Sequence, residues 1–345
     1  MNTRSGTTNI KILVAVFVAI AIAVVAIVRL DTTGKKGSGL GEEFTYDLEK
    51  LGTIDPNLIL YKESAQEIIT SLSVSHGIAV ASDGSIYVAG NKAIRKFSES
   101  GNSLSEIILS DMPRCLTVAD DGKIYVGMKD HVEIYENQGT KLSTWKSLGN
   151  DAVLTSIAVS KNDVFVADAG NRIVYRFDTE GNLINRIGDK NEVKNISGFF
   201  IPSPHFDLAV GHDGLLRVAN PGNHRIEAYT SEGDLEFSWG KFSNVNIEGF
   251  CGCCNPVNFA ILADESFVTC EKGLVRVKIY DPEGVFTGVV AGSKKLTGKA
   301  GQICNIPAEC QSRAFDVAVD AKDRIFILDT DKNVVRIFTK IKEEQ

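Results

Sequence analysis

The sequence predicts an all-β protein, a six-bladed β-propeller with an N-terminal transmembrane helix. Three observations predict it: a pattern of strands and turns that repeats along most of the chain, alternation of apolar and polar residues within the strands, and one uncharged apolar run near the N-terminus. The 345-residue chain has a net charge of −7 and no basic cluster, so nucleic acid is not an expected partner.

The apolar run Ile12 to Val28 has 17 residues without a charge, enough for a helix to cross a bilayer core with little tilt. A cleavable signal peptide is the alternative, but its apolar core usually has about 7 to 15 residues and ends at a small-residue site. We expect residues 1–11 to form a short cytoplasmic tail, 12–30 an uncleaved signal anchor and 31–56 a flexible tether. The protein would then be a single-pass membrane protein, with residues 57–345 in the periplasm or the extracellular space.

Beyond the tether the chain repeats a four-strand unit. Two strands and a polar turn recur in segments such as GIAVASDGSIYVAG from Gly77 and DLAVGHDGLLRVANPGN from Asp207. A third alternating strand follows in each unit, and Gly-containing turns lead to a fourth in most of them. The six first strands align at Ile78, Leu116, Ile157, Leu208, Phe259 and Val317. Four-stranded sheets repeated around a channel form a β-propeller, here with six blades.

The last unit has no predicted fourth strand, because the chain ends at VVRIFTKIKEEQ without a Gly turn. The strand-like segment NLILY, Asn57 to Tyr61, precedes the first unit and belongs to none. We expect this segment to complete the last blade and so join the two ends of the ring. An open solenoid capped by the same segment is the alternative.

The units resemble NHL repeats. SIAVSKNDVFVADAGNRIVYRF from Ser156 follows the pattern of that family, and FSWG ending at Gly240 is typical of its fourth strand. The resemblance covers about Asn57 to Lys342 and implies a six-bladed propeller. It leaves the activity open, since the family includes interaction scaffolds as well as a few lyases and esterases.

The first strand of each blade lines the channel of a propeller, so the residue before each aligned position is a candidate for a central site. Those residues are Gly77, Cys115, Ser156, Asp207, Asn258 and Asp316. Hydrolytic propellers of the paraoxonase and squid-type phosphotriesterase kind hold Ca²⁺ on such oxygens, which are the ligands that Ca²⁺ requires. Asp207, Asn258 and Asp316 suit a calcium site, whereas Gly77 and Cys115 depart from it. Polar residues that solvate a water-filled channel are the alternative.

The histidines offer weaker support for metal chemistry. Amidating lyases of this fold use a zinc ion held by histidines, and catalytic zinc generally has three protein ligands. Only His76 and His205 lie at blade entrances, while His131, His212 and His224 fall in later strands or turns. His76 and His205 therefore join Ser156, Asp207, Asn258 and Asp316 as channel-binding candidates, and no residue is assigned a catalytic role.

Seven cysteines raise a separate question. Cys251, Cys253 and Cys254 lie in the predicted linker that enters the fifth blade, and Cys270 is placed at the end of the second strand, at the position of Asp168 and Asn220. Cys304 and Cys310 lie in the next linker. We expect these six thiols on one rim, either as three disulfides, typical of an exported protein, or as a zinc or iron-sulfur site, with free redox thiols as a third alternative. Cys115 is interpreted as a small buried hydrophobe.

The sequence thus predicts a membrane-anchored extracytoplasmic propeller that acts as a binding or assembly module for a protein or small-molecule ligand, rather than an enzyme. Two alternatives stay open. One is a calcium-dependent hydrolase, lactonase-like or phosphotriesterase-like, with its site in the channel. The other is a redox protein that uses the cysteines to hold an iron-sulfur cluster or another metal.

Overall fold

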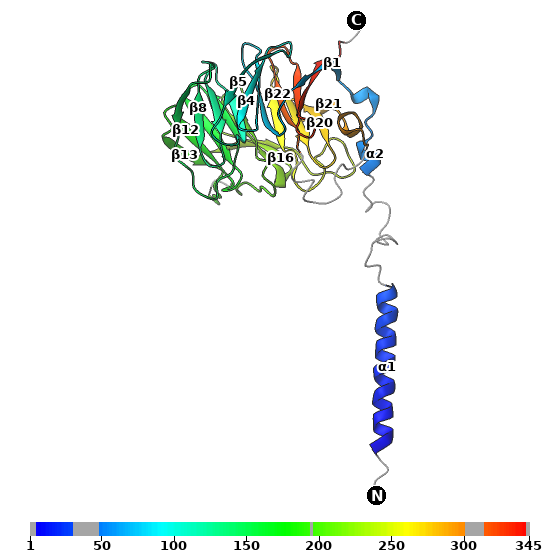
Figure 1. The fold of residues 1–345 in the computed structure, drawn as a ribbon. Coiled ribbons are helices and arrows are strands. Elements are labelled where there is room, and N and C mark those ends of the chain that lie inside the picture. The colour runs from blue at the N-terminus through cyan, green and yellow to red at the C-terminus, as the bar shows by residue number, and fades with distance from the viewer. Residues whose placement is uncertain (1–4, 30–47, 194–195, 301–313, 343–345) are drawn as a thin grey trace. The chain divides into compact units, whose positions relative to one another are not determined.

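The structure is a computed structural model that describes residues 5–29, 48–193, 196–300 and 314–342. The chain divides into two units after Asp47. The first contains helix α1 (Ser5–Arg29; Figure 1). Its side chains at residues 12–25 are exposed. Among the described residues, no helix combines the length and the apolar character needed to cross a bilayer.

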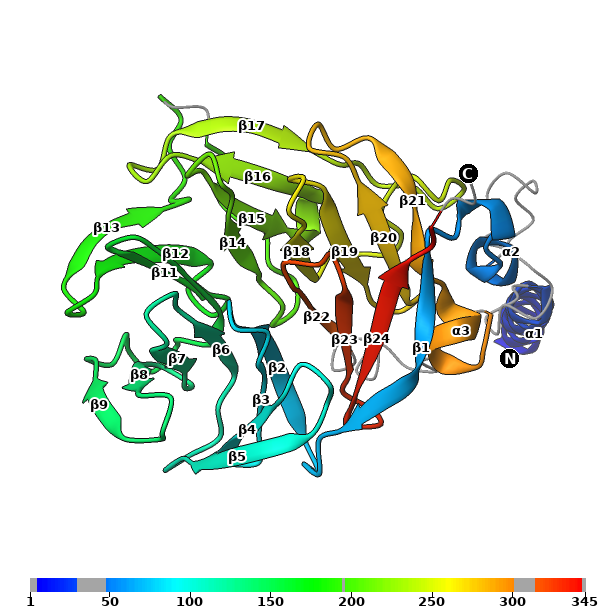
Figure 2. The ribbon, with the colours of Figure 1, turned by 90° about the horizontal axis from the view of Figure 1, so that it is seen from above.

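The second unit consists of six four-stranded antiparallel sheets set around a central axis, as Figure 2 shows. The first three sheets are built from consecutive strands. Blade one contains β2 (Ser75–Val80), β3 (Ile86–Gly90), β4 (Ala93–Phe97) and β5 (Ser103–Ile108). Blade two contains β6 (Cys115–Val118), β7 (Ile124–Gly127), β8 (Val132–Tyr135) and β9 (Lys141–Thr144). Blade three contains β10 (Leu154–Ser160), β11 (Asp163–Asp168), β12 (Ile173–Asp178) and β13 (Leu183–Ile187).

The next two sheets follow the same order, and the sixth does not. Blade four contains β14 (Leu208–Val210), β15 (Leu216–Asn220), β16 (Arg225–Tyr229) and β17 (Leu235–Trp239). Blade five contains β18 (Asn258–Ile261), β19 (Phe267–Glu271), β20 (Arg276–Tyr280) and β21 (Phe286–Ala291). Blade six contains β22 (Asp316–Val319), β23 (Ile325–Asp329), β24 (Val334–Lys340) and β1 (Tyr61–Ile69). The predicted six-bladed propeller is therefore confirmed.

In the described part of the chain, four short helices accompany these strands, two of them before β1, one between β15 and β16, and one between β21 and β22. They are α2 (Leu48–Gly52), η2 (Pro56–Leu58), η3 (Pro221–Asn223) and α3 (Ser293–Thr297).

The ring closes as expected, but not with the expected residues. Strand β1 pairs antiparallel with β24, so an N-terminal strand completes the last blade. The predicted segment NLILY contributes only Tyr61 to that strand. Its earlier residues form η2, and Ile59 makes an isolated bridge to Val289 of blade five. The charged segment that follows NLILY supplies β1, because an edge strand buries only a few of its side chains: Tyr61 and Ile68 are 3% and 1% exposed.

Apolar clusters between neighbouring blades hold the ring together. One such cluster joins Val88 of blade one to Leu328 and Val335 of blade six, and Ile68 of β1 packs into the same cluster. The closing strand therefore stabilises the contact between the first and last blades as well as the edge of its own sheet.

Two tryptophans show why turn glycines recur in the repeat. Gly181 and Gly284 lie in turns between third and fourth strands and have φ of +87° and +82°, a left-handed conformation that favours glycine. A Cβ at Gly181 would lie 2.6 Å from the Trp145 ring, and one at Gly284 would lie 2.3 Å from Trp239. Each turn thus packs against the tryptophan at the end of the fourth strand of the preceding blade, and this contact explains the tryptophan in the FSWG ending.

Candidate functional site

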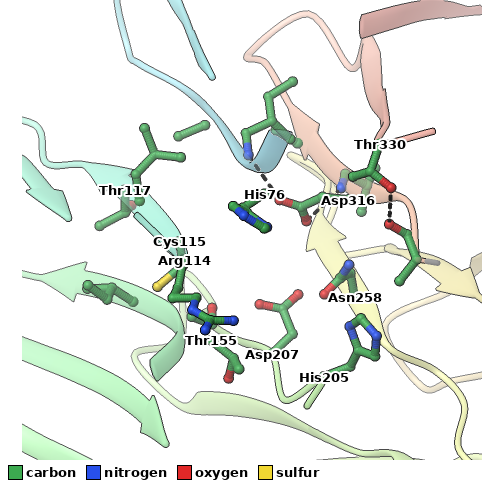
Figure 3. Close-up of a pocket in the computed structure, with 18 of the residues that line it drawn as sticks. His76, Arg114, Cys115, Thr117, Thr155, His205, Asp207, Asn258, Asp316 and Thr330 are labelled. Atoms are coloured by element: carbon green, nitrogen blue, oxygen red, sulfur yellow. Dashed lines mark hydrogen bonds between the residues drawn. The ribbon is translucent and has the colours of Figure 1, made fainter. Parts of the chain in front are cut away.

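A cavity of about 640 Å³ lies at the propeller axis, where segments from all six blades line it. Five of the six predicted ring residues line this cavity, namely Cys115, Ser156, Asp207, Asn258 and Asp316. The predicted His76 and His205 line it as well, as Figure 3 shows. The structure therefore brings all six predicted channel-binding candidates together around one cavity.

The two aspartates join neighbouring first strands through backbone hydrogen bonds. Asp207 of blade four accepts a hydrogen bond from its neighbour Leu208 N at 2.9 Å and one from Phe259 N of blade five at 2.8 Å. Asp316 of blade six accepts from Val317 N at 2.8 Å and from Ile78 N of blade one at 3.0 Å. Each carboxylate thus supports the ring by satisfying donors where two blades meet.

The other polar ring residues make similar connections. The Asn258 side chain donates to Phe315 O of blade six at 2.7 Å. Ser156 Oγ lies 3.4 Å from both N and O of Leu208 in blade four. Gly77 has no side chain to do this, and a Cβ at this position would lie 3.2 Å from the Leu116 side chain and 3.3 Å from Cys115 Cα of the next blade. The ring positions therefore have a structural role in addition to facing the cavity.

The aspartates are hard to ionise where they lie. Burial raises the pKa of Asp207 to about 6, against the lowering effect of its hydrogen bonds. Burial and the nearby charge of Asp207 raise the pKa of Asp316 to about 7. Part of each residue faces the cavity, while protein surrounds each carboxyl group. Two such groups would gain from a positively charged or donating partner in the cavity.

The cavity also contains a cation that the repeat pattern did not predict. Arg114 directly precedes Cys115, lines the cavity, and is exposed. Figure 3 shows its side chain on the same side of the cavity as Asp207. Burial and then the charge of Arg114 lower the pKa of His76. The sequence could have predicted Arg114 from its position, one residue before the ring residue Cys115, from which a long side chain can reach the channel.

Among the residues that the structure describes, no three or more His, Cys, Asp or Glu side chains are arranged to hold a metal ion, and the predicted calcium site stays a prediction. Asp207 and Asp316 use their carboxyl oxygens on backbone amides, and Asn258 uses its amide nitrogen on a carbonyl oxygen.

The predicted cysteine cluster is corrected in part. Asn258 pairs with Cys270 in blade five, as Ser156 pairs with Ala167 in blade three. Cys270 therefore occupies the position of Ala167, and Glu271 occupies that of Asp168. A shift of one residue turns a strand side chain to the opposite face. Cys270 is accordingly buried in the apolar core of blades five and six rather than set beside the linker thiols.

The thiols of the described part of the chain are all free, so the predicted disulfides are not found there. They are Cys115, Cys251, Cys253, Cys254 and Cys270. Cys304 and Cys310 lie outside the described residues. Cys115 is 6% exposed and packs in an apolar cluster, as predicted. Burial raises its pKa well above the usual range of a thiol.

A buried ionic network in blade five was not predicted. Glu271, Arg276 and Lys278 are each at most 1% exposed. Glu271 accepts from Arg276 Nε at 2.6 Å and Nη2 at 2.9 Å, and its Oε2 lies 3.4 Å from Lys278 Nζ. Burial lowers the pKa of Lys278 to about 7.

This network holds the linker that contains the three neighbouring cysteines. Lys278 Nζ donates to Ile247 O at 2.9 Å and to Gly249 O at 2.8 Å. Glu271 Oε1 accepts from Cys251 N at 2.8 Å. The charged side chains thus satisfy backbone groups of a linker that lies outside the strands of the sheet.

Comparisons with known proteins support the fold. No protein-family model matches the chain, and no curated protein matches it in sequence. Solved structures do match. The chain is a six-bladed β-propeller. Virginiamycin B lyase from Staphylococcus aureus superposes on it with a TM-score of 0.56 at 15% identity, over 81% of this chain and 100% of the lyase.

Two further structures give similar values. A streptogramin B lyase matches with a TM-score of 0.57 and 13% identity, over 83% of this propeller protein and 100% of the lyase. A protein of unknown function from Bacteroides thetaiotaomicron matches with a TM-score of 0.58 and 14% identity, over 84% and 73% of the two chains. Such low identities show the fold alone, and the NHL family stays a prediction.

Proposed function

We propose that this protein is a binding module that takes a small polar ligand in the central cavity, and that the uncharged run from Ile12 to Val28 tethers it to a membrane with the propeller outside the cytoplasm. The observation that carries the ligand proposal is the pair of buried carboxyl groups, Asp207 and Asp316, which face a cavity of about 640 Å³ whose mouth also holds Arg114.

The charges around the cavity define the class of ligand. An ammonium group placed between Asp207 and Asp316 would favour their ionised forms, which burial now disfavours. Arg114 offers a planar guanidinium to a carboxylate or phosphate on the same molecule. We therefore propose a zwitterionic ligand that carries an amine and an acidic group, with the side-chain carbonyl oxygen of Asn258 able to accept one more hydrogen bond from the amine.

The test uses thermal shift and calorimetry on the full chain in detergent, with a panel of amino acids, amino phosphates and polyamines. A ligand that binds the native state stabilises it by RT ln(1 + [L]/Kd). Asp207→Asn and Arg114→Ala should each weaken binding at least tenfold, while His212→Gln, an exposed residue that does not line the cavity, should leave it unchanged. Equal binding by all four proteins would refute the site.

The hydrolase alternative gives a distinct result. Calcium-dependent turnover of lactone or phosphotriester substrates that disappears in Asp207→Ala would contradict the binding proposal. Stabilisation by a zwitterion without turnover would support it.

The tether rests on the uncharged run from Ile12 to Val28 and on the exposure of the side chains at residues 12–25. A charge at the centre of a membrane helix costs about 2.5 to 3.5 kcal/mol on insertion scales. Ile20→Arg should therefore release part of the protein from membranes washed with alkaline carbonate, and Ile20→Leu should not. Complete release of the unchanged protein by the same wash would refute the tether.

A further inference from the structure

Cys253 and Cys254 form an adjacent pair of thiols in the linker that enters blade five. Their sulfur atoms lie 3.3 Å apart, in direct contact. Cys253 is exposed, whereas Cys254 is 2% exposed and lies directly against it. A ligand can therefore reach the Cys253 sulfur from solvent, and the Cys254 sulfur lies directly behind it.

The backbone around the pair is held on both sides. Cys251 N donates to Glu271 at 2.8 Å, and Gly252 O accepts from His224 Nε2 at 2.7 Å. Asn255 donates to Cys251 O at 2.5 Å and to Lys272 O at 3.1 Å, and accepts from Lys272 N at 2.8 Å. These bonds hold the backbone before and after the two cysteines, so the fold fixes where this part of the linker lies.

We propose that Cys253 and Cys254 are a chelating site for soft, trivalent acceptors of the arsenite class. With bonds to sulfur of about 2.3 Å, as in thiolate complexes of zinc, two sulfurs 3.3 Å apart subtend about 90° at the bound atom. A tetrahedral zinc ion needs a wider angle. A pyramidal trivalent centre has nearly perpendicular bonds to sulfur and fits the pair without movement of the loop.

The binding step involves no change of oxidation state. An organic arsenoxide, R–As=O, reacts with two thiols to give R–As bonded to both sulfurs, and the oxygen leaves as water with the two thiol protons. Burial, followed by the contact with Cys254, raises the pKa of the Cys253 thiol. Cys253 therefore holds its proton at neutral pH in the free site, and this proton is one of the two that leave in the water; a disulfide would instead need the sulfurs to close to about 2.05 Å.

The experiment titrates the reduced full-length protein with phenylarsine oxide and follows bound arsenical by intact mass and free thiols by a colorimetric reagent. One equivalent should remove two thiols, and a small dithiol should restore them where an excess of a monothiol does not. Loss of one sulfur removes the chelate effect, which is worth about 10² to 10⁴ in affinity. Cys253→Ser and Cys254→Ser should therefore bind at least 100-fold more weakly.

Cys251→Ser is the matched control, since it lies in the same loop but outside the pair, and it should bind like the unchanged protein. Because Cys253 is exposed, Cys253→Ser should keep the melting temperature and carries the test if Cys254→Ser fails to fold. Binding by Cys253→Ser within threefold of the unchanged protein would overturn the proposal. So would an equal loss in Cys251→Ser, or tighter binding of zinc than of the arsenical through the same two residues.

Discussion

Replacement of Glu271 by glutamine tests the buried network of blade five most directly. Glu271 is the counter-charge for two fully buried cations, Arg276 and Lys278, and it also accepts from Cys251 N. Removing one partner of a buried pair leaves an uncompensated charge and costs about 3 to 5 kcal/mol. For a unit of about 300 residues, with an unfolding entropy of about 2.1 cal/mol/K per residue, that corresponds to a fall in Tm of roughly 5 to 8 °C.

Urea denaturation of Glu271→Gln measures the loss. Glu265→Gln is the matched control, because Glu265 also belongs to blade five and pairs with the exposed His212, so its loss should stay below about 1 kcal/mol. The effect of Glu271→Gln should be larger at pH 6 than at pH 9, since Lys278 can release its proton at the higher pH. A loss below about 1 kcal/mol at both pH values would refute the reasoning.

Lys278, Asp316 and Ile68 provide three further tests. Burial lowers the pKa of Lys278 in the folded protein to about 7. The charged lysine therefore destabilises the fold fully below pH 7, and this effect is relieved as the pH rises from 7 toward 10.5. Lys278→Met should remove the resulting rise of the unfolding free energy with pH, which is up to about 1.4 kcal/mol per pH unit in that window. Burial and the charge of Asp207 raise the pKa of Asp316 in the folded protein to about 7, so its contribution to stability is complete below pH 3.8 and is lost as the pH rises through 7. Asp316→Asn should therefore reduce the pH dependence of the unfolding free energy, measured with urea, between pH 4 and 7. An unchanged slope would contradict the raised pKa of Asp316. Ile68→Ala, at a site 1% exposed in β1, should cost about 2 to 5 kcal/mol, while Ile69→Ala, 67% exposed, should stay within about 0.5 kcal/mol; equal losses would show that β1 does not close the ring.

The first strands could be read from sequence because their pattern is local. A small or polar residue, a short β-branched run and a polar turn recur in each unit, so the repeat alone is enough to place Asp207 and Asp316 on the channel. The closing strand could not be found this way. The charged segment that forms β1 buries mainly Tyr61 and Ile68. The sequence pattern instead predicts a strand in the more apolar NLILY segment, because burial at a sheet edge depends on the partner strand, which the local pattern does not show.

The position of Cys270 depends on strand register, which the repeat pattern defines only to within a residue. Matching the ends of second strands placed it with Asp168, but the register of β18 with β19 places it with Ala167. In a strand an error of one residue exchanges the two faces. The face decides whether the thiol meets the linker cysteines or the core, so the predicted cluster depended on a register that the sequence did not specify.

Comparison of blade five with blade four shows a sequence pattern that indicates the buried charges of blade five. Asn220 donates to Glu227 in blade four, and Arg225 donates to the same carboxylate. In blade five the corresponding residues are Glu271 and Lys278, so the acidic group has moved from the third strand to the second and a cation has taken its place. Such an exchange keeps the side chains at these two positions complementary. It indicates that the two positions are in contact, although the pattern of one unit alone would predict that both face solvent.

The channel residues separate into two groups by what their hydrogen bonds do. Asp207 and Asp316 bind backbone amides of the neighbouring blade, so the need to close the ring constrains which residues can stand there. Arg114, directly before β6, and His76, within β2, each lie one residue before a ring position and line the same cavity. Selectivity between ligands should therefore depend more on Arg114 and His76 than on the aspartates, whose loss would weaken the fold together with the site.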